Sequence, residues 1–107
     1  MIAIAIDERR LAAGSVVRGR VSFDEEEDGT KSVELSVVWE TSGKGDTDLG
    51  VLHFEAVTNA RGEHAFAVQL PLLPLSYDGV IVKIGWLVRA RRGQLVVDEA
   101  FEVIAIA

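Results

Sequence analysis

A strict alternation of apolar and polar residues runs along most of this chain and restricts the possible folds more than any other feature of the sequence. Because successive side chains of a β-strand point to opposite faces, such alternation predicts strands with one buried and one solvated face. No stretch of the sequence shows the longer period of an amphipathic helix. The residues expected to face inward are Val17, Gly19, Val21 and Phe23, then Val33, Leu35, Val37 and Trp39, then Leu52, Phe54 and Ala56, then Phe66, Val68 and Leu70, and finally Val82, Ile84, Trp86 and Val88.

About seven strands follow from this pattern. Glycine-rich turn signals separate them, because glycine adopts turn conformations without steric cost. Pro71 and Pro74 interrupt the pattern, and since proline cannot donate to a sheet ladder, we expect the chain to cross between sheets there. A change of phase near residues 98–100 predicts a bulge in the last strand. The predicted strands are residues 1–6, 15–23, 32–42, 50–57, 63–70, 80–91 and 94–106, and the predicted fold is an all-β antiparallel sandwich.

The composition agrees with one folded domain over residues 1–107. Hydrophobic residues make up 49% of the chain, which is enough to form a core and argues against disorder. The chain has no cysteine, which excludes disulfides, thiolate nucleophiles and zinc–cysteine sites and agrees with a reducing compartment. Neither a secretory signal nor an apolar run of the ~20 residues that span a bilayer is present, so the sequence predicts a cytoplasmic protein.

The net charge of −6 disfavours binding to nucleic acid, because a phosphate backbone repels an acidic domain. One basic cluster, formed by Arg89, Arg91 and Arg92, is too small to reverse that repulsion. We expect these three side chains to line the solvent face of a strand.

The sequence predicts no catalytic residue, no cofactor and no bound metal. A hairpin turn at residues 59–62 would place His53 opposite residue 67 or 68, so that His53 and His64 do not converge on one metal ion. Ser42 and Ser76 lie in turns, and no nucleophile elbow surrounds either of them.

Three charged segments have features of ion or phosphate sites. The run from Asp24 to Asp28 lacks the alternating spacing of a calcium loop and is expected to be a solvated loop, although ion binding there stays open. Asp46 and Asp48 have the spacing of calcium ligands but lack the remaining ligands. The segment from Gly43 to Gly45 has no helix after it, and the acids that follow would repel phosphate.

Two segments resemble the arrestin-like family. Residues 70–79, Leu-Pro-Leu-Leu-Pro-Leu-Ser-Tyr-Asp-Gly, precede a long strand with the central aromatic Trp86, and residues 14–21, Gly-Ser-Val-Val-Arg-Gly-Arg-Val, are similar to the early glycine signature of that family. The motif residues are Gly14, Gly19, Pro71, Pro74, Ser76, Tyr77, Gly79 and Trp86.

The resemblance implies an immunoglobulin-like sandwich and an adaptor or scaffold role. Arrestins carry two such domains in tandem, whereas this chain has room for one, so receptor binding and phosphate sensing are not carried over. From the residues themselves we expect structural roles: the two prolines stiffen the crossing, Ser76 bonds to backbone in a local turn, and Gly79 adopts a backbone conformation closed to other residues.

The ends of the chain suggest where a partner binds. Isoleucine alternates with alanine in both terminal strands, which offers apolar surface on both faces, and an uncovered apolar edge invites pairing with another chain. We therefore hypothesise a homo-oligomer formed through the terminal strands; the alternative is that the two ends pair with each other inside the sandwich. The candidate partner-binding residues are Ile2, Ile4, Ile104 and Ile106 at the ends, and Ile81 and Leu87 on the solvent side of their strand.

The predicted function is a non-catalytic protein–protein interaction module. The alternative is a small-ligand carrier, which would need an internal cavity of a few hundred Å3 where an adaptor would be packed solid.

Overall fold

The computed structural model describes residues 2–23, 32–43, 45–57, 62–79 and 81–105. These residues form nine strands and no helix, and so no helix that is long and apolar enough to cross a membrane. The strands are β1 (Ile2–Ile6), β2 (Arg10–Ala12), β3 (Val16–Phe23), β4 (Val33–Gly43), β5 (Asp46–Val57), β6 (Gly62–Gln69), β7 (Tyr77–Asp78), β8 (Val82–Arg92) and β9 (Leu95–Ile104).

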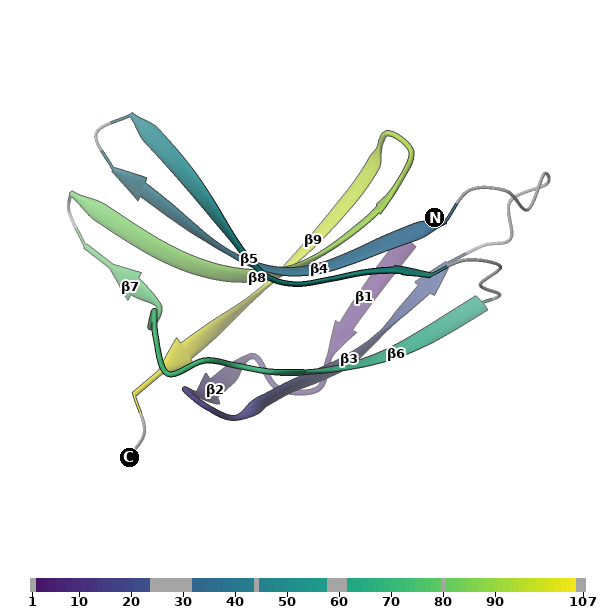
Figure 1. Ribbon diagram of the computed structural model, residues 1–107, viewed down its shortest axis with the longest axis horizontal. Helices are drawn as coiled ribbons and strands as arrows, with labels where there is room; N and C mark the ends of the chain where they lie inside the picture. Colours follow the sequence, from purple (N-terminus) through teal and green to yellow (C-terminus); the bar gives the residue numbers. More distant parts are fainter. Residues whose placement is uncertain (1, 24–31, 44, 58–61, 80, 106–107) are drawn as a thin grey trace.

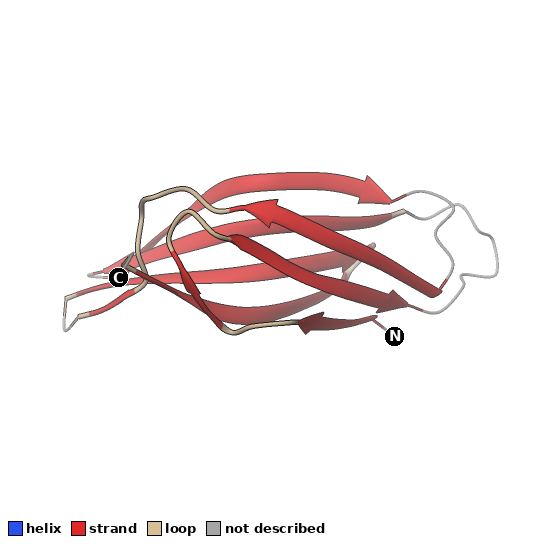
Figure 2. Ribbon diagram, turned by 90° about the horizontal axis from the view of Figure 1, so that it is seen from below, coloured by secondary structure: helices blue, strands red, loops and turns tan. Residues whose placement is uncertain are grey.

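The strands form two sheets that lie face to face (Figures 1 and 2). The small sheet has the order β1-β3-β6, and the large sheet has the order β2-β9-β8-β4-β5. The short strand β7 pairs with the start of β8, and β9 pairs with the rest of it. All pairs are antiparallel except β2 with β9. The predicted all-β sandwich is confirmed, but the described residues hold nine strands instead of about seven, since β2 and β7 have three and two residues and are too short to show alternation.

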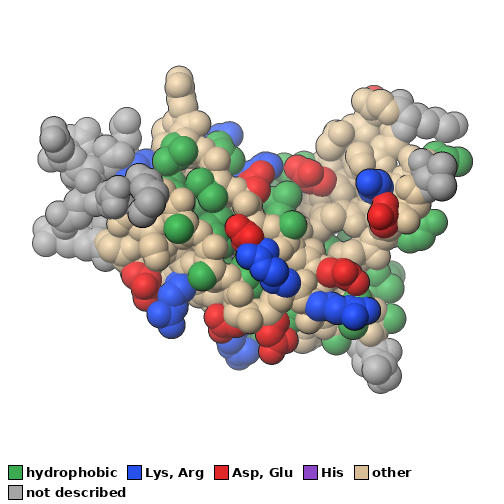
Figure 3. Space-filling view, turned by 180° about the vertical axis from the view of Figure 1, so that it is seen from behind, with side chains coloured by type: hydrophobic (Ala, Val, Ile, Leu, Met, Phe, Trp, Pro, Cys, Tyr) green, Lys and Arg blue, Asp and Glu red, His purple; other side chains and the backbone are tan. Residues whose placement is uncertain are grey.

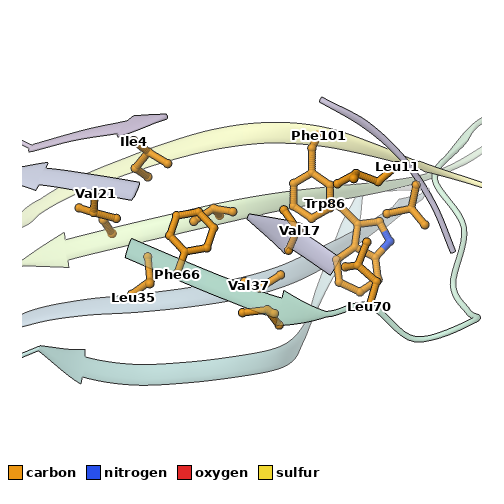
Figure 4. Packing of buried hydrophobic residues seen from close by; sticks show 14 of the residues in the cluster. Ile4, Leu11, Val17, Val21, Leu35, Val37, Phe66, Leu70, Trp86 and Phe101 are labelled. Atoms are coloured by element: carbon orange, nitrogen blue, oxygen red, sulfur yellow. The ribbon is translucent and has the colours of Figure 1, made fainter. Parts of the chain in front are cut away.

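The core lies between the sheets and follows the predicted alternation. Val17, Leu35 and Val88 have no solvent-exposed surface, and each comes from a different strand. Figure 4 shows the ring of Phe66 from the small sheet in the same cluster as the aliphatic side chains of Val17 and Leu35. Burying each such side chain contributes about 1.5–3 kcal/mol, so this layer is the main stabilising element.

An aromatic row crosses the large sheet at one end of the core. The Trp86 ring centroid lies 5.2 Å from that of Trp39 and 6.0 Å from that of Phe101, because the three residues occupy directly paired positions on β4, β8 and β9. Such tilted pairs add about 0.5–1.5 kcal/mol each to the burial of their area. The row ends over Gly50 of β5, where any Cβ atom would overlap the Trp39 ring.

The predicted hairpin between the strands at 50–57 and 63–70 is wrong. β5 pairs with β4 from Asp46 to Val57, and β6 pairs with β3 in the other sheet. The chain therefore changes sheets between β5 and β6. The turn assigned to residues 59–62 falls mostly outside the described residues, as does the acidic run 24–28.

The predicted bulge at residues 98–100 is also wrong, since β9 pairs with β8 in unbroken register from Leu95 to Phe101. The register instead shifts between Val37 and Val38, where β5 carries one additional residue. This bulge reverses the phase of the second half of β5. Phe54, predicted to face inward, is therefore 58% exposed on the outer face, and His53, paired with Val37, turns inward.

Gly19 is required by a close approach of two strands. A Cβ atom there would overlap the carbonyl oxygen of Ala5 on β1 and lie 2.8 Å from Cζ of Phe66. The resemblance marked this glycine, and the structure gives the steric reason for it.

We expect Gly19→Ala to lower the free energy of unfolding by about 1–3 kcal/mol, because an overpacked site forces the backbone of β1 to move. Gly85→Ala is the matched control, since a Cβ atom at Gly85 meets no atom within 4 Å, and it should change stability by less than about 0.5 kcal/mol. Urea denaturation of both variants measures this, and equal losses would contradict the close approach of β1.

Candidate partner-binding site

The terminal strands do not offer the predicted surface. Ile2 and Ile4 are only 6% and 8% exposed and belong to the core, so the expectation that they offer apolar surface to a partner is corrected. The exposed face of β1 carries only Ala3 and Ala5, which are small. Nor do the two ends pair with each other, because β1 lies in the small sheet and β9 in the large one.

The other predicted partner-binding residues lie in different surroundings. Ile104 is half-buried and pairs with Ala12 on β2, and Ile106 lies outside the described residues. Leu87 is half-buried on the outer face of the large sheet, beside Val38. Ile81, in contrast, is 64% exposed, so its side chain is available to a partner.

Five exposed apolar side chains belong to the segment between β6 and β7, to β7 and to the start of β8. Figure 1 draws these parts of the chain at the left end of the sandwich. Leu72, Leu73 and Ile81 are 63%, 73% and 64% exposed. Tyr77 is 59% exposed and Val82 is 38% exposed. We call these five residues the apolar end.

Three long-range hydrogen bonds hold the segment that leads to the apolar end. The Trp86 indole Nε1 donates to the carbonyl oxygen of Pro74 at 2.9 Å. Ser76 bonds twice to Val103 on β9: its amide donates to the Val103 carbonyl at 2.9 Å, and its Oγ accepts from the Val103 amide at 2.8 Å. Ser76 therefore ties the crossing to a distant strand, and the predicted local turn bond is corrected.

The two segments that carry the family resemblance touch each other. The Gly14 amide donates to the Pro71 carbonyl at 3.2 Å, and the Leu70 amide donates to the Ser15 carbonyl at 2.8 Å. Gly14 has a φ of 82°, a left-handed conformation that glycine adopts without strain. The predicted crossing at Pro71 and Pro74 is confirmed, because it leads from β6 in the small sheet to β7 in the large one.

Gly79 is required for a reason other than the predicted one. Its φ lies outside the left-handed region, and its amide donates to the Val82 carbonyl at 3.0 Å. A Cβ atom there would overlap the Tyr77 ring. The glycine therefore lets Tyr77 fold over the turn between β7 and β8.

The large sheet extends beyond the small one at this end, where β4, β5 and β8 curve away (Figure 1). We call residues 41–43, 46–51 and 82–84 of these strands the overhang. A groove of about 340 Å3 lies on it, with Asp46 and Asp48 of β5 along one wall and Ile81 and Val82 along the other. Sequence reasoning missed this groove, because it noted only the calcium-like spacing of Asp46 and Asp48 and did not place these residues opposite Ile81.

β5 forms the edge of the large sheet. In the part of the chain that the structure describes, it pairs with β4 alone, so one side of its twelve residues carries no neighbouring strand. An exposed edge with unpaired backbone groups is a template for another strand.

His53 and His64 approach the same carboxylate, contrary to the predicted register. His53 Nε2 lies 3.5 Å from Oε1 of Glu55, and His64 Nε2 lies 3.5 Å from Oε2. These contacts link β5 of the large sheet to β6 of the small sheet. Among the described residues, however, no three side chains of metal-binding type are arranged to hold an ion.

The basic cluster divides between the two faces of β8. Arg89 donates to both carboxylate oxygens of Asp98, at 2.8 and 3.1 Å, and the hydrogen bond to Asp98 raises the pKa of Arg89 above its ordinary value. Arg92, predicted to be solvated, is 8% exposed and lies over the Phe23 ring. On the face shown in Figure 3, acidic and basic side chains are interspersed, so this face carries no large patch of a single charge sign.

Comparisons with known proteins confirm the fold. The structure of Spo0M, a sporulation control protein from Bacillus subtilis, aligns with a TM-score of 0.66 at 17% identity and covers 98% of this chain and 49% of Spo0M. A β-glucosidase from Listeria innocua, in complex with gluconolactone, aligns with a TM-score of 0.55 at 16% identity over 100% of this chain and 16% of the enzyme. No family profile and no curated protein sequence matches the chain.

These likenesses establish an arrestin-like fold, as the resemblance predicted. At such low identity they show the fold alone. The chain spans about half the length of Spo0M.

We expect Ser76→Ala to destabilise the protein by about 1–3 kcal/mol, because it leaves the amide of the buried Val103 without its acceptor. Ser42→Ala should cost less than about 0.5 kcal/mol, since the Ser42 side chain forms no hydrogen bond with the described residues. Equal urea midpoints for the two variants would show that the bond to Val103 does not hold the crossing.

Proposed function

We propose that residues 1–107 act as one cytoplasmic, non-catalytic interaction module that binds another protein through the apolar end. The observation that carries this proposal is that, of the ten exposed large hydrophobic side chains among the described residues, five lie between Leu72 and Val82. Scattered apolar residues are normal on a protein surface, but a concentration of them in one region is typical of a binding site.

The apolar end is held in place before any partner arrives. The bonds from Trp86 to Pro74 and between Ser76 and Val103 fix the segment that presents Leu72 and Leu73. Less conformational entropy is lost on binding when the contact residues are already ordered, and this supports a recognition surface.

A small-ligand carrier has less support. Its ligand would have to enter between the sheets, where Val17, Val37 and Val88 have no exposed surface. The grooves found among the described residues have volumes of about 310–380 Å3 and open at the surface.

The burial of Ile2 and Ile4 moves the proposed contact away from the terminal strands. Homo-oligomer formation remains a prediction, and a photo-crosslinking amino acid can test the contact directly. With the label at position 81, we expect a discrete cross-linked protein adduct in the source cells, because Ile81 is 64% exposed within the apolar end.

The label at Ala3 is the matched control, because Ala3 is exposed on the terminal strand first expected to bind a partner. An adduct at Ala3 with none at position 81 would contradict the apolar end and favour the terminal strands. The mass of the adduct distinguishes a second copy from a different protein.

A further inference from the structure

We propose that the first half of β5, together with the groove of the overhang, binds an extended peptide segment that alternates basic and apolar residues and adds to β5 as a further strand. This inference rests on the proposed function and specifies the chemistry of the partner.

We place the peptide on the first half of β5, which precedes the bulge and the contacts that Glu55 makes with the two histidines. Beyond the bulge, a side-chain contact links β5 to the facing sheet, since Glu55 lies 3.5 Å from His64 of β6. Residues 46–51 precede the bulge and lie in the overhang, where the structure describes no strand beside them other than β4. Six residues span about 20 Å, which suits a short extended peptide.

The two faces of this half-strand differ in chemistry. Asp46 and Asp48 pair with Gly43 and Thr41 and point into the groove. Leu49 and Val51 point to the opposite face and are 49% and 56% exposed. Because paired residues on neighbouring strands share a face, an added strand places every second side chain beside a carboxylate and the others beside Leu49 and Val51.

The two carboxylates of the groove are free to pair with a basic side chain of a ligand, whereas most other carboxylates in the described residues already form ion pairs. Glu63 pairs with Arg20, Glu99 with Arg9 and Asp98 with Arg89. Asp46 and Asp48 form no ion pair with any described side chain. Lysine or arginine at alternate positions of a peptide would neutralise both of them.

The opposite wall of the groove favours the same ligand. Ile81 and Val82 offer apolar surface beside the carboxylates, and the long aliphatic stem of a lysine or arginine packs on such surface while its charge reaches an acid. A purely apolar strand would leave Asp46 and Asp48 desolvated and unpaired, and an acidic strand would be repelled. Main-chain pairing supplies affinity and the alternating side chains supply specificity.

The test uses fluorescence anisotropy with a labelled synthetic octapeptide of alternating lysine and valine. We expect saturable binding that weakens as salt rises. An alternating glutamate–valine peptide, a block peptide of four lysines and four valines, and an alternating lysine–valine peptide with N-methyl groups on alternate amides should each bind at least tenfold more weakly. Equal binding of the block or N-methylated peptide would overturn strand addition.

The double substitution Asp46→Asn/Asp48→Asn should weaken binding of the alternating peptide about three- to tenfold, on the scale of two exposed ion pairs. Asp7→Asn/Glu8→Asn removes the same net charge from another exposed, unpaired pair and should leave binding unchanged. Equal losses in the two variants would mean that the peptide senses only net charge, which overturns the site.

The remaining outcomes separate this inference from the proposed function. If no peptide binds but the cross-link at position 81 persists, the inference fails and the interaction module stands. Light scattering could instead show a dimer that persists in the presence of the peptide and is absent in Asp46→Asn/Asp48→Asn. A second copy of the chain would then occupy the edge of β5, and the inference would be overturned.

Discussion

The buried indole of Trp86 is the contact on which the rest of the structure depends. It is 1% exposed, packs between Trp39 and Phe101, and donates its N–H to the Pro74 carbonyl at 2.9 Å. A buried indole needs a partner for this group, since an unsatisfied donor costs about 1–3 kcal/mol. The same bond therefore completes the core and fixes the crossing between the sheets. Because the crossing is fixed, the apolar end has a defined position.

The unequal lengths of the two sheets explain why this end stays open. β4, β5 and β8 have 11, 12 and 11 residues, whereas β1, β3 and β6 have 5, 8 and 8. At about 3.3 Å per residue, the longer strands extend roughly 10 Å beyond the longest strands of the small sheet. The inward-directed face of that extension cannot join the core, so it carries carboxylates and half-buried side chains. The overhang follows from strand length, and the groove follows from the overhang.

Alternation of apolar and polar residues was enough to predict the class of fold and most of the core. A strand with one buried face needs an apolar residue at every second position, and this pattern is visible within the strand's own sequence. Strand partners were less predictable. The predicted pairing of residues 50–57 with 63–70 assumed that neighbouring strands form a hairpin, but the chain changes sheets there. The bulge beside Val38 left no local signal, and it turned His53 inward and Phe54 outward. The site was missed because Asp46 and Ile81 meet only through the pairing of three strands.

The central claim is that the first half of β5 is left uncovered to receive a strand. Amide hydrogen exchange, followed residue by residue with and without saturating alternating lysine–valine peptide, tests it most directly. The account predicts that alternate amides of residues 46–51 exchange rapidly in the free protein and become protected on binding, while β1 is unchanged. Protection that appears on β1, or that spreads evenly over the molecule, would contradict it.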